Sequence, residues 1–217
     1  MSTFKNKKPV IAIDGTAGSG KGELAKKLSK ILGFDHLDSG ILYRIYAYEL
    51  LRKGGKLENL SLIEIDFNVF FKKSSNANLR TEEISKFASI IAKESLVREK
   101  LISVQRKFAN SPPNGIGSII DGRDITTKIA PNAEIKFYLD ADVNIRAKRR
   151  QIQLGLKNKD YSEILRMMVN RDVQDKNRKI SPLRKAQGSL FIDTTNISEL
   201  DVLNSAIKYI KEKTDFI

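Results

Sequence analysis

A short glycine-rich segment near the N-terminus constrains the fold of this 217-residue chain more than any other feature. The continuous apolar run at 9–13 has the composition of a buried parallel strand. The range 21–32 carries apolar residues at helical spacing and is followed by Gly33. Residues 15–21 join the two and follow the pattern G-x-x-x-x-G-K. A chain with this loop between a strand and a helix is expected to form an α/β fold.

The chemistry of this loop explains its glycines. Several backbone N–H groups must surround each phosphate, so the loop turns tightly, and glycine allows such turns without an obstructing side chain. The following helix N-terminus adds a partial positive charge, and Lys21 adds a full one. We therefore predict that this segment binds ATP. The predicted nucleotide-binding residues are Gly15, Thr16, Ala17, Gly18, Ser19, Gly20, Lys21, Gly22 and Glu23.

The two residues after Lys21 set expectations for the metal. Phosphate loops commonly place Ser or Thr after the lysine as a ligand of Mg²⁺, whereas this chain has Gly22. Because Gly22 provides no hydroxyl, we expect Mg²⁺ to be held mostly by the phosphates and water. Glu23 would repel phosphates if it faced them, so we expect its carboxylate to point aside.

Further along the chain, apolar runs alternate with stretches of helical spacing. The runs at 116–121, 135–139 and 190–192 predict buried strands. The predicted helices are 41–51, 142–154, 161–176 and 198–213. Strands separated by helices form βαβ units, so we expect a P-loop three-layer sandwich with a central parallel sheet of about five strands.

The segment 57–110 interrupts this alternation. It contains a strand-like piece at 67–71, a polar turn at 72–78 and two helical stretches, and we interpret it as an inserted substrate-binding region. The chain is then a single domain, 1–217. Its core would comprise 1–56, 111–154 and 162–217, with a short lid at 155–161.

Composition limits the classes of function. There is no cysteine, which excludes disulfides, zinc–thiolate sites and a cysteine nucleophile. No apolar stretch approaches the roughly 18 residues of a membrane span, so we expect a cytoplasmic protein without a membrane partner. The formal charge of +13, from 39 Lys and Arg against 26 Asp and Glu, fits a nucleic acid or a small anion as partner, or a lysine-rich composition with no such partner.

Three later segments carry a more specific pattern. They are LDSGILYR at 37–44, IDGRD at 120–124 and RDVQDKNR at 171–178. Together with the glycine loop, and in the same order, they closely resemble the bacterial cytidylate kinases, a nucleoside monophosphate kinase family. The resemblance spans nearly the whole chain. It implies a P-loop kinase that uses ATP and Mg²⁺ to convert CMP and dCMP to CDP and dCDP.

The resemblance also implies an acceptor site. A monophosphate carries about two negative charges, which arginine forks bind well, and by resemblance Arg44 and Arg123 hold it. Cytosine N4 needs an acceptor and its O2 and N3 need donors, roles that the resemblance gives to Asp124 and Arg98, with Ser89 assisting. The implied acceptor-binding residues are Ser39, Tyr43, Arg44, Ser89, Arg98, Arg123, Asp124, Arg171, Asp175 and Arg178.

Arginines before the predicted lid complete the implied machinery. Arg146, Arg149 and Arg150 can close over the transferring phosphoryl group and neutralise its charge. Gly155 is the expected hinge for that closure. The resulting catalytic set is Lys21, Arg123, Arg149 and Arg150.

Alternative readings remain open at this point. Arg171, Asp175 and Arg178 share one helix face, which by spacing alone is typical of a solvated charged surface. Ser89 could equally lie on a polar helix face. The chain could phosphorylate another monophosphate or a small metabolite. A nucleic-acid-binding module switched by ATP is a further class, although only 7% of residues are aromatic. We take the enzyme to be a monomer acting on small molecules, without nucleic acid.

Overall fold

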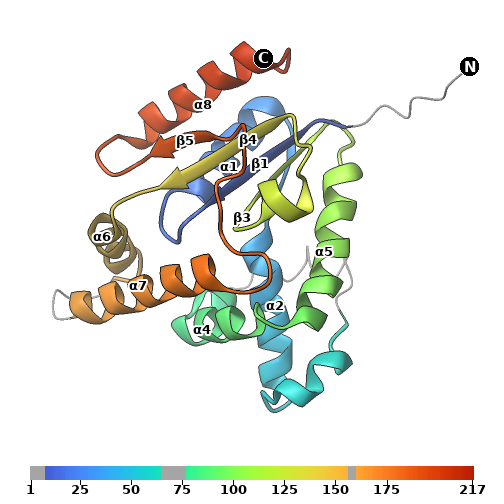
Figure 1. Ribbon diagram of the computed structural model, residues 1–217, viewed down its shortest axis with the longest axis vertical. Coiled ribbons are helices and arrows are strands. Elements are labelled where there is room, and N and C mark those ends of the chain that lie inside the picture. Colours follow the sequence, from blue (N-terminus) through green and yellow to red (C-terminus); the bar gives the residue numbers. More distant parts are fainter. Residues whose placement is uncertain (1–7, 65–76, 156–159) are drawn as a thin grey trace, which may run out of the picture. The chain divides into compact units, whose positions relative to one another are not determined.

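The computed structural model describes residues 8–64, 77–155 and 160–217 (Figure 1). The chain divides into two compact units. Unit 1 comprises Met1–Leu37 and Phe108–Ile217, and unit 2 comprises Asp38–Lys107. Among the described helices, none is long and apolar enough to cross a membrane.

A five-stranded sheet contains the first strand at its centre. The strands are β1 (Val10–Gly15), β2 (Asp35–Asp38), β3 (Ser118–Gly122), β4 (Ile135–Asp140) and β5 (Leu190–Asp193), in the order β2-β3-β1-β4-β5. β1 pairs in parallel with both β3 and β4, and β4 pairs in parallel with β5. The predicted α/β fold with a parallel sheet of about five strands is therefore confirmed. All of β1 is buried, which explains its unbroken apolar sequence.

The edge strand β2 was not predicted from the sequence. Its residues Asp35, His36 and Asp38 are polar, and only Leu37 is buried. An edge strand lacks a neighbour on one side, so it does not need the apolar run that marks a central strand. The strand-like piece predicted at 67–71 lies outside the described residues.

The helices of unit 1 agree with the sequence prediction. They are α1 (Lys21–Leu32), α6 (Val143–Gln153), α7 (Tyr161–Asn177) and α8 (Glu199–Lys213). Apolar residues of α1 and α8 pack on β1, β3, β4 and β5 to form the main core. A short π-helical turn, η3 (Ile125–Ile129), follows β3. This packing fixes the carboxyl ends of the strands, where open α/β sheets bind their ligands.

Unit 2 is mainly helical. It contains α2 (Ser39–Arg52), the 3₁₀ turns η1 (Leu57–Leu62) and η2 (Ala77–Arg80), α4 (Glu82–Ile91), and most of α5 (Ser95–Asn110). The two helices expected within 57–110 are present as α4 and α5. Unit 2 begins earlier in the sequence than the insert predicted at 57–110, because it includes α2, which packs against α4 and η2.

Candidate active site

The loop between β1 and α1 owes its shape to three glycines. At Gly15 a Cβ atom would lie 2.1 Å from the Leu139 carbonyl oxygen, so no other residue fits there. Gly18 and Gly20 have φ values of 74° and 85°, in the left-handed region that favours glycine. A Cβ at Gly20 would meet no atom within 4 Å, so that position is set by backbone conformation alone.

Several polar groups of this loop fit a bound phosphate. Gly20 is the N-cap of α1 and provides no side chain for the first N–H groups of that helix. Ser19 Oγ is buried and has no hydrogen-bond partner among the described residues. Lys21 Nζ donates to the Thr16 carbonyl 3.2 Å away, so its charge stays beside the loop. Unpaired donors and a cation are what an anion needs.

Gly22 and Glu23 follow Lys21 in the first turn of α1. The Glu23 carboxylate is 57% exposed and lies 3.5 Å from Lys26 Nζ, so it points aside from the loop. Gly22 faces Asp121 of β3, whose Oδ2 would be 3.8 Å from a Cβ at position 22. The other oxygen of Asp121 contacts His36 Nε2 at 2.7 Å. Among the described residues, no group of three or more acidic or histidine side chains could hold a metal ion by itself.

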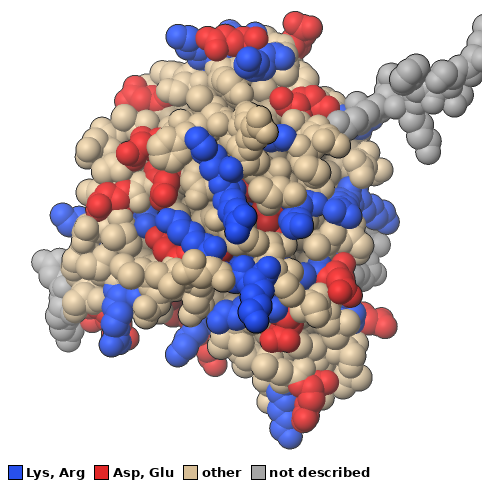
Figure 2. All heavy atoms as spheres, viewed as in Figure 1, with Lys and Arg blue, Asp and Glu red and all other residues tan. Residues whose placement is uncertain are grey.

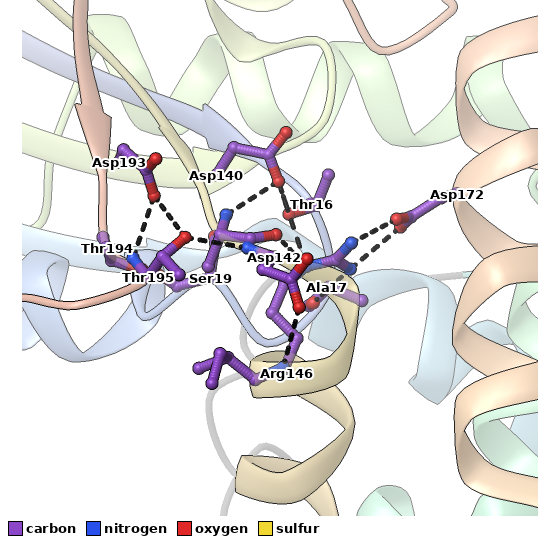
Figure 3. Close-up of polar contacts among 12 residues, drawn as sticks. Thr16, Ala17, Ser19, Asp140, Asp142, Arg146, Asp172, Asp193, Thr194 and Thr195 are labelled. Carbon is purple, nitrogen blue, oxygen red and sulfur yellow. Dashed lines mark hydrogen bonds and ion pairs between the residues drawn. The ribbon is translucent and has the colours of Figure 1, made fainter. Parts of the chain in front are cut away.

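Polar contacts from later parts of unit 1 hold the loop (Figure 3). Thr16 Oγ1 donates to Asp140 Oδ1 at 2.6 Å, at the end of β4. Thr194 Oγ1, after β5, donates to the Ser19 carbonyl at 3.0 Å. The predicted catalytic residue Arg149 donates from Nη2 to the Thr194 carbonyl at 2.6 Å. Arg149 is therefore connected to the loop through one intervening residue, Thr194.

The other two arginines of α6 differ in their surroundings. Arg146 is only 3% exposed, and its Nε donates to the Ala141 carbonyl. It therefore lacks the exposure expected of an arginine that closes over the phosphoryl group. Arg150 donates to Gln153 Oε1 at 2.8 Å on an exposed surface. The expected hinge Gly155 has a φ of 63°. Most of the lid predicted at 155–161 lies outside the described residues.

A cluster of charged residues joins the segment after β3 to the end of α7. Arg123 Nε donates to Asp175 Oδ2 at 2.8 Å, and Arg178 Nη1 lies 3.4 Å from Asp175 Oδ1. Arg178 Nη2 is 3.9 Å from Asp124 Oδ1. Burial alone would raise the pKa of Asp175, but Arg123, Arg171 and Arg178 outweigh burial and the pKa is lowered. The predicted acceptor residues of unit 1 therefore form one cluster.

The predicted acceptor residues of unit 2 form two groups. Arg44 Nη1 donates to Ser85 Oγ at 2.6 Å and to the Leu79 carbonyl at 3.0 Å. Ser89 Oγ donates to the Ser85 carbonyl at 3.1 Å, so Ser85 lies between Arg44 and Ser89.

Tyr43 and Arg98 make the second group. Arg98 is only 2% exposed, and the centre of its guanidinium lies 5.7 Å from the Tyr43 ring centroid. Its Nε donates to the Ala92 carbonyl at 2.6 Å. Ser39, at the start of α2, is also buried. Buried polar side chains of this kind are typical of a binding site as well as of a structural network.

Comparison with known proteins decides the family. The sequence model of cytidylate kinase matches residues 11–212. The chain belongs to the cytidylate kinase family. A cytidylate kinase of Bradyrhizobium diazoefficiens is 36% identical over 205 residues, covering 93% of this chain and 95% of that one. A cytidylate kinase of Bartonella bacilliformis is 41% identical over 196 residues, covering 87% of this chain and 88% of that one.

Solved structures support the fold. A gluconokinase from Sinorhizobium meliloti 1021 superposes with a TM-score of 0.50 at 9% identity, covering 96% of this chain and 94% of that one. At this identity the likeness concerns the fold alone.

One buried acid of this cytidylate kinase family member was missed by the sequence reasoning. Asp14, the residue before the loop, is fully buried at the end of β1. It accepts hydrogen bonds from the backbone N–H groups of Ile125 (2.9 Å) and Thr126 (2.8 Å) and from Thr126 Oγ1 (2.6 Å). It therefore holds the turn that follows Asp124. A charged residue ending an otherwise apolar strand was the available signal.

Asp14 should give the stability a distinctive pH dependence. Burial raises its pKa from 3.8 to about 6, against the hydrogen bonds from Thr126 and Ile125 that lower it. The native state then binds the proton more tightly than the unfolded state, so this contribution is complete below pH 3.8 and is lost as pH rises through 6. Because the pKa is raised by about 2, the free energy of unfolding lost in this way is about 3 kcal/mol. Asp14→Asn has no titrating carboxyl group and should not show this loss.

Urea unfolding between pH 4 and pH 7 measures the effect as the difference between wild type and Asp14→Asn. Thr126→Val is the matched control, since it removes one donor but keeps the titrating carboxyl group, so its pH dependence should persist. Parallel curves for wild type and Asp14→Asn would contradict the raised pKa.

Proposed function

We propose that this member of the cytidylate kinase family transfers the terminal phosphoryl group of ATP to CMP and dCMP. The observation that carries the proposal is the cluster of Arg123, Asp124, Asp175 and Arg178 in the same unit as the nucleotide loop. These residues come from two of the four segments that resemble the family. Membership of that family and the names of its relatives support the same acceptor.

The reaction needs charge neutralisation and alignment more than a strong base. The acceptor phosphate is already an anion, so its oxygen can attack without losing a proton to the protein. Lys21 and the N–H groups of the loop bind the ATP phosphates. Arg44 and Arg123 bind the acceptor phosphate, and Arg149 and Arg150 neutralise charge that develops during transfer. Closure over the substrates excludes water, which would otherwise hydrolyse ATP.

Selection of the base depends on hydrogen-bond direction. The Asp124 side chain accepts from the amino group at cytosine N4, whereas uracil presents an acceptor at that position. Arg98 and Ser89 supply donors to the other polar edge of cytosine. Arg171, together with Asp175 and Arg178, binds the ribose hydroxyls. We propose these roles as a set, because removing one changes the charge around the others.

Mg²⁺ fits this arrangement as a partner of ATP. When bound to the phosphates, it would spread and neutralise the charge of the transferred group. Asp121 is the acidic side chain beside Gly22, and its carboxylate would supply oxygen ligands of the kind that Mg²⁺ prefers. We propose that the phosphates and water provide the remaining ligands, which suits the missing hydroxyl at position 22.

The net charge of +13 by itself fits a small anionic ligand as well as a nucleic acid. On the face shown in Figure 2, acidic side chains lie among the basic ones. Arginines of the resembling segments are paired with specific carboxylates, as in Arg123–Asp175. We propose that the chain works as a cytoplasmic monomer on CMP, dCMP and ATP, with neither nucleic acid nor a membrane as partner.

Turnover on a panel of monophosphates tests the base assignment. ADP release should be fastest with CMP and dCMP, and slower with UMP, AMP and GMP. Asp124→Asn should lower kcat/KM for CMP about 30-fold, because its amide presents a donor as well as an acceptor to N4, and leave ATP binding nearly unchanged. Equal losses for CMP turnover and ATP binding would argue against the base role. AMP or UMP outperforming CMP would refute the assignment itself.

A further inference from the structure

Arg146 connects the nucleotide loop to two helices of unit 1. Its Nε donates to the Ala141 carbonyl at 2.7 Å, and its Nη1 donates to the Ala17 carbonyl of the loop at 3.1 Å. Figure 3 shows the guanidinium between Ala17 and Asp172. A single buried side chain thus contacts the loop, the segment before α6 and, through Asp172, helix α7.

Both terminal nitrogens of the Arg146 guanidinium donate hydrogen bonds to the Asp172 carboxylate. Arg146 Nη1 lies 3.2 Å from Asp172 Oδ1, and Nη2 lies 2.5 Å from Oδ2. This fork-to-fork geometry fixes the orientation of both side chains. Both side chains are buried. Asp172 is on α7, the helix that also carries Asp175 of the charged cluster.

The loop also packs against these helices through apolar atoms. A Cβ at Gly18 would lie 3.2 Å from Met168 Cε of α7 and 3.3 Å from Arg146 Cβ. Ala17 packs on the small core formed by Ala147, Ile164 and Met168. The loop backbone therefore packs against α6 and α7, and Arg146 adds a hydrogen bond to it at Ala17.

The energetics favour a role in positioning. Burying an ion pair costs desolvation, and an apolar pair of similar size is often as stable, so stability alone does not explain Arg146 and Asp172. We propose that Arg146 is a positioning residue that holds the loop backbone in its phosphate-binding shape, and that Asp172 fixes Arg146 for this task. ATP binding then depends on a carboxylate of the helix that carries acceptor residues. This inference relies on the proposed function for the roles of the loop and of α7.

Kinetics of paired variants test the inference. The double variant Arg146→Met/Asp172→Leu removes both charges, so the fold can keep its stability. The hydrogen bond from Arg146 to the Ala17 carbonyl is lost in this variant. We expect the KM for ATP to rise about tenfold, because a small displacement of binding groups has effects of this size, while the KM for CMP changes by less than about threefold. Arg146→Lys keeps the charge beside Asp172 but cannot reach all its partners at once, and should raise the KM for ATP as well.

Two controls separate positioning from stability. Urea unfolding of each variant measures the stability of the fold, and Glu163→Leu is the matched loss of a carboxylate at an exposed position of the same helix. An ATP KM within about twofold of wild type in both Arg146 variants would overturn the inference, as would equal increases in both KM values. Turnover of CMP by the wild type is measured in the same assay, so failure of the proposed function would be recognised separately.

Discussion

Lys21→Met should reduce kcat for phosphoryl transfer about 10³-fold, because it removes the only full positive charge within the nucleotide loop itself. Lys21 Nζ lies 3.2 Å from the Thr16 carbonyl oxygen, which places the charge beside the loop. A loss of this size corresponds to about 4 kcal/mol of transition-state stabilisation. Steady-state kinetics with saturating CMP measure it.

The matched control for this variant is Lys30→Met. Lys30 is an exposed lysine in the last turn of the same helix, so it removes the same charge away from the loop. Its kcat should stay within about twofold of wild type. A Lys21→Met enzyme that kept more than about a tenth of the wild-type kcat would show that the loop binds ATP without needing this charge.

Arg123→Met should reduce kcat/KM for CMP about 10³-fold and affect the Kd of ATP far less. The guanidinium is the proposed bidentate partner of the acceptor phosphate, and its Nε also donates to the half-buried Asp175 carboxylate at 2.8 Å. Arg123→Lys keeps the charge but not the fork, so an intermediate loss of about 10²-fold is expected. Kinetics with varied CMP and calorimetric titration with an ATP analogue separate the two effects.

Stability must be followed in the same Arg123 variants. Removing Arg123 leaves the Asp175 carboxylate with fewer compensating charges, although Arg178 remains 3.4 Å away. Arg184→Met, at an exposed position of unit 1, is the control for loss of one arginine. If Arg123→Met impaired ATP and CMP binding equally, the side chain would be structural and its assignment to the acceptor phosphate would be wrong.

Much of unit 1 could be predicted from the sequence because its signals are local. The apolar run of β1, the glycines of the loop and the helical spacing of α1 lie within 25 consecutive residues, and each agrees with the structure. The polar strand β2 escaped prediction, because an edge strand carries little apolar periodicity.

The supporting contacts of the site could not be predicted in the same way. Thr194 meets Ser19 from 175 residues away, and Asp14 meets Thr126 from 112 residues away. Nothing in the local pattern distinguishes Arg146 from Arg149, since both lie in one basic helix. Their different surroundings arise only when α7 brings Asp172 against the helix. Long-range pairing of this kind is a property of the tertiary fold.

The most direct test of the central claim follows the phosphoryl group itself. Purified wild-type protein is incubated with CMP, Mg²⁺ and ATP labelled in its terminal phosphate, and the products are separated by chromatography. The account predicts that the label appears in CDP, in equal amounts to the ADP formed, and that little label is released as inorganic phosphate when CMP is present. Label found only in inorganic phosphate, or transferred to another monophosphate in preference to CMP, would contradict it.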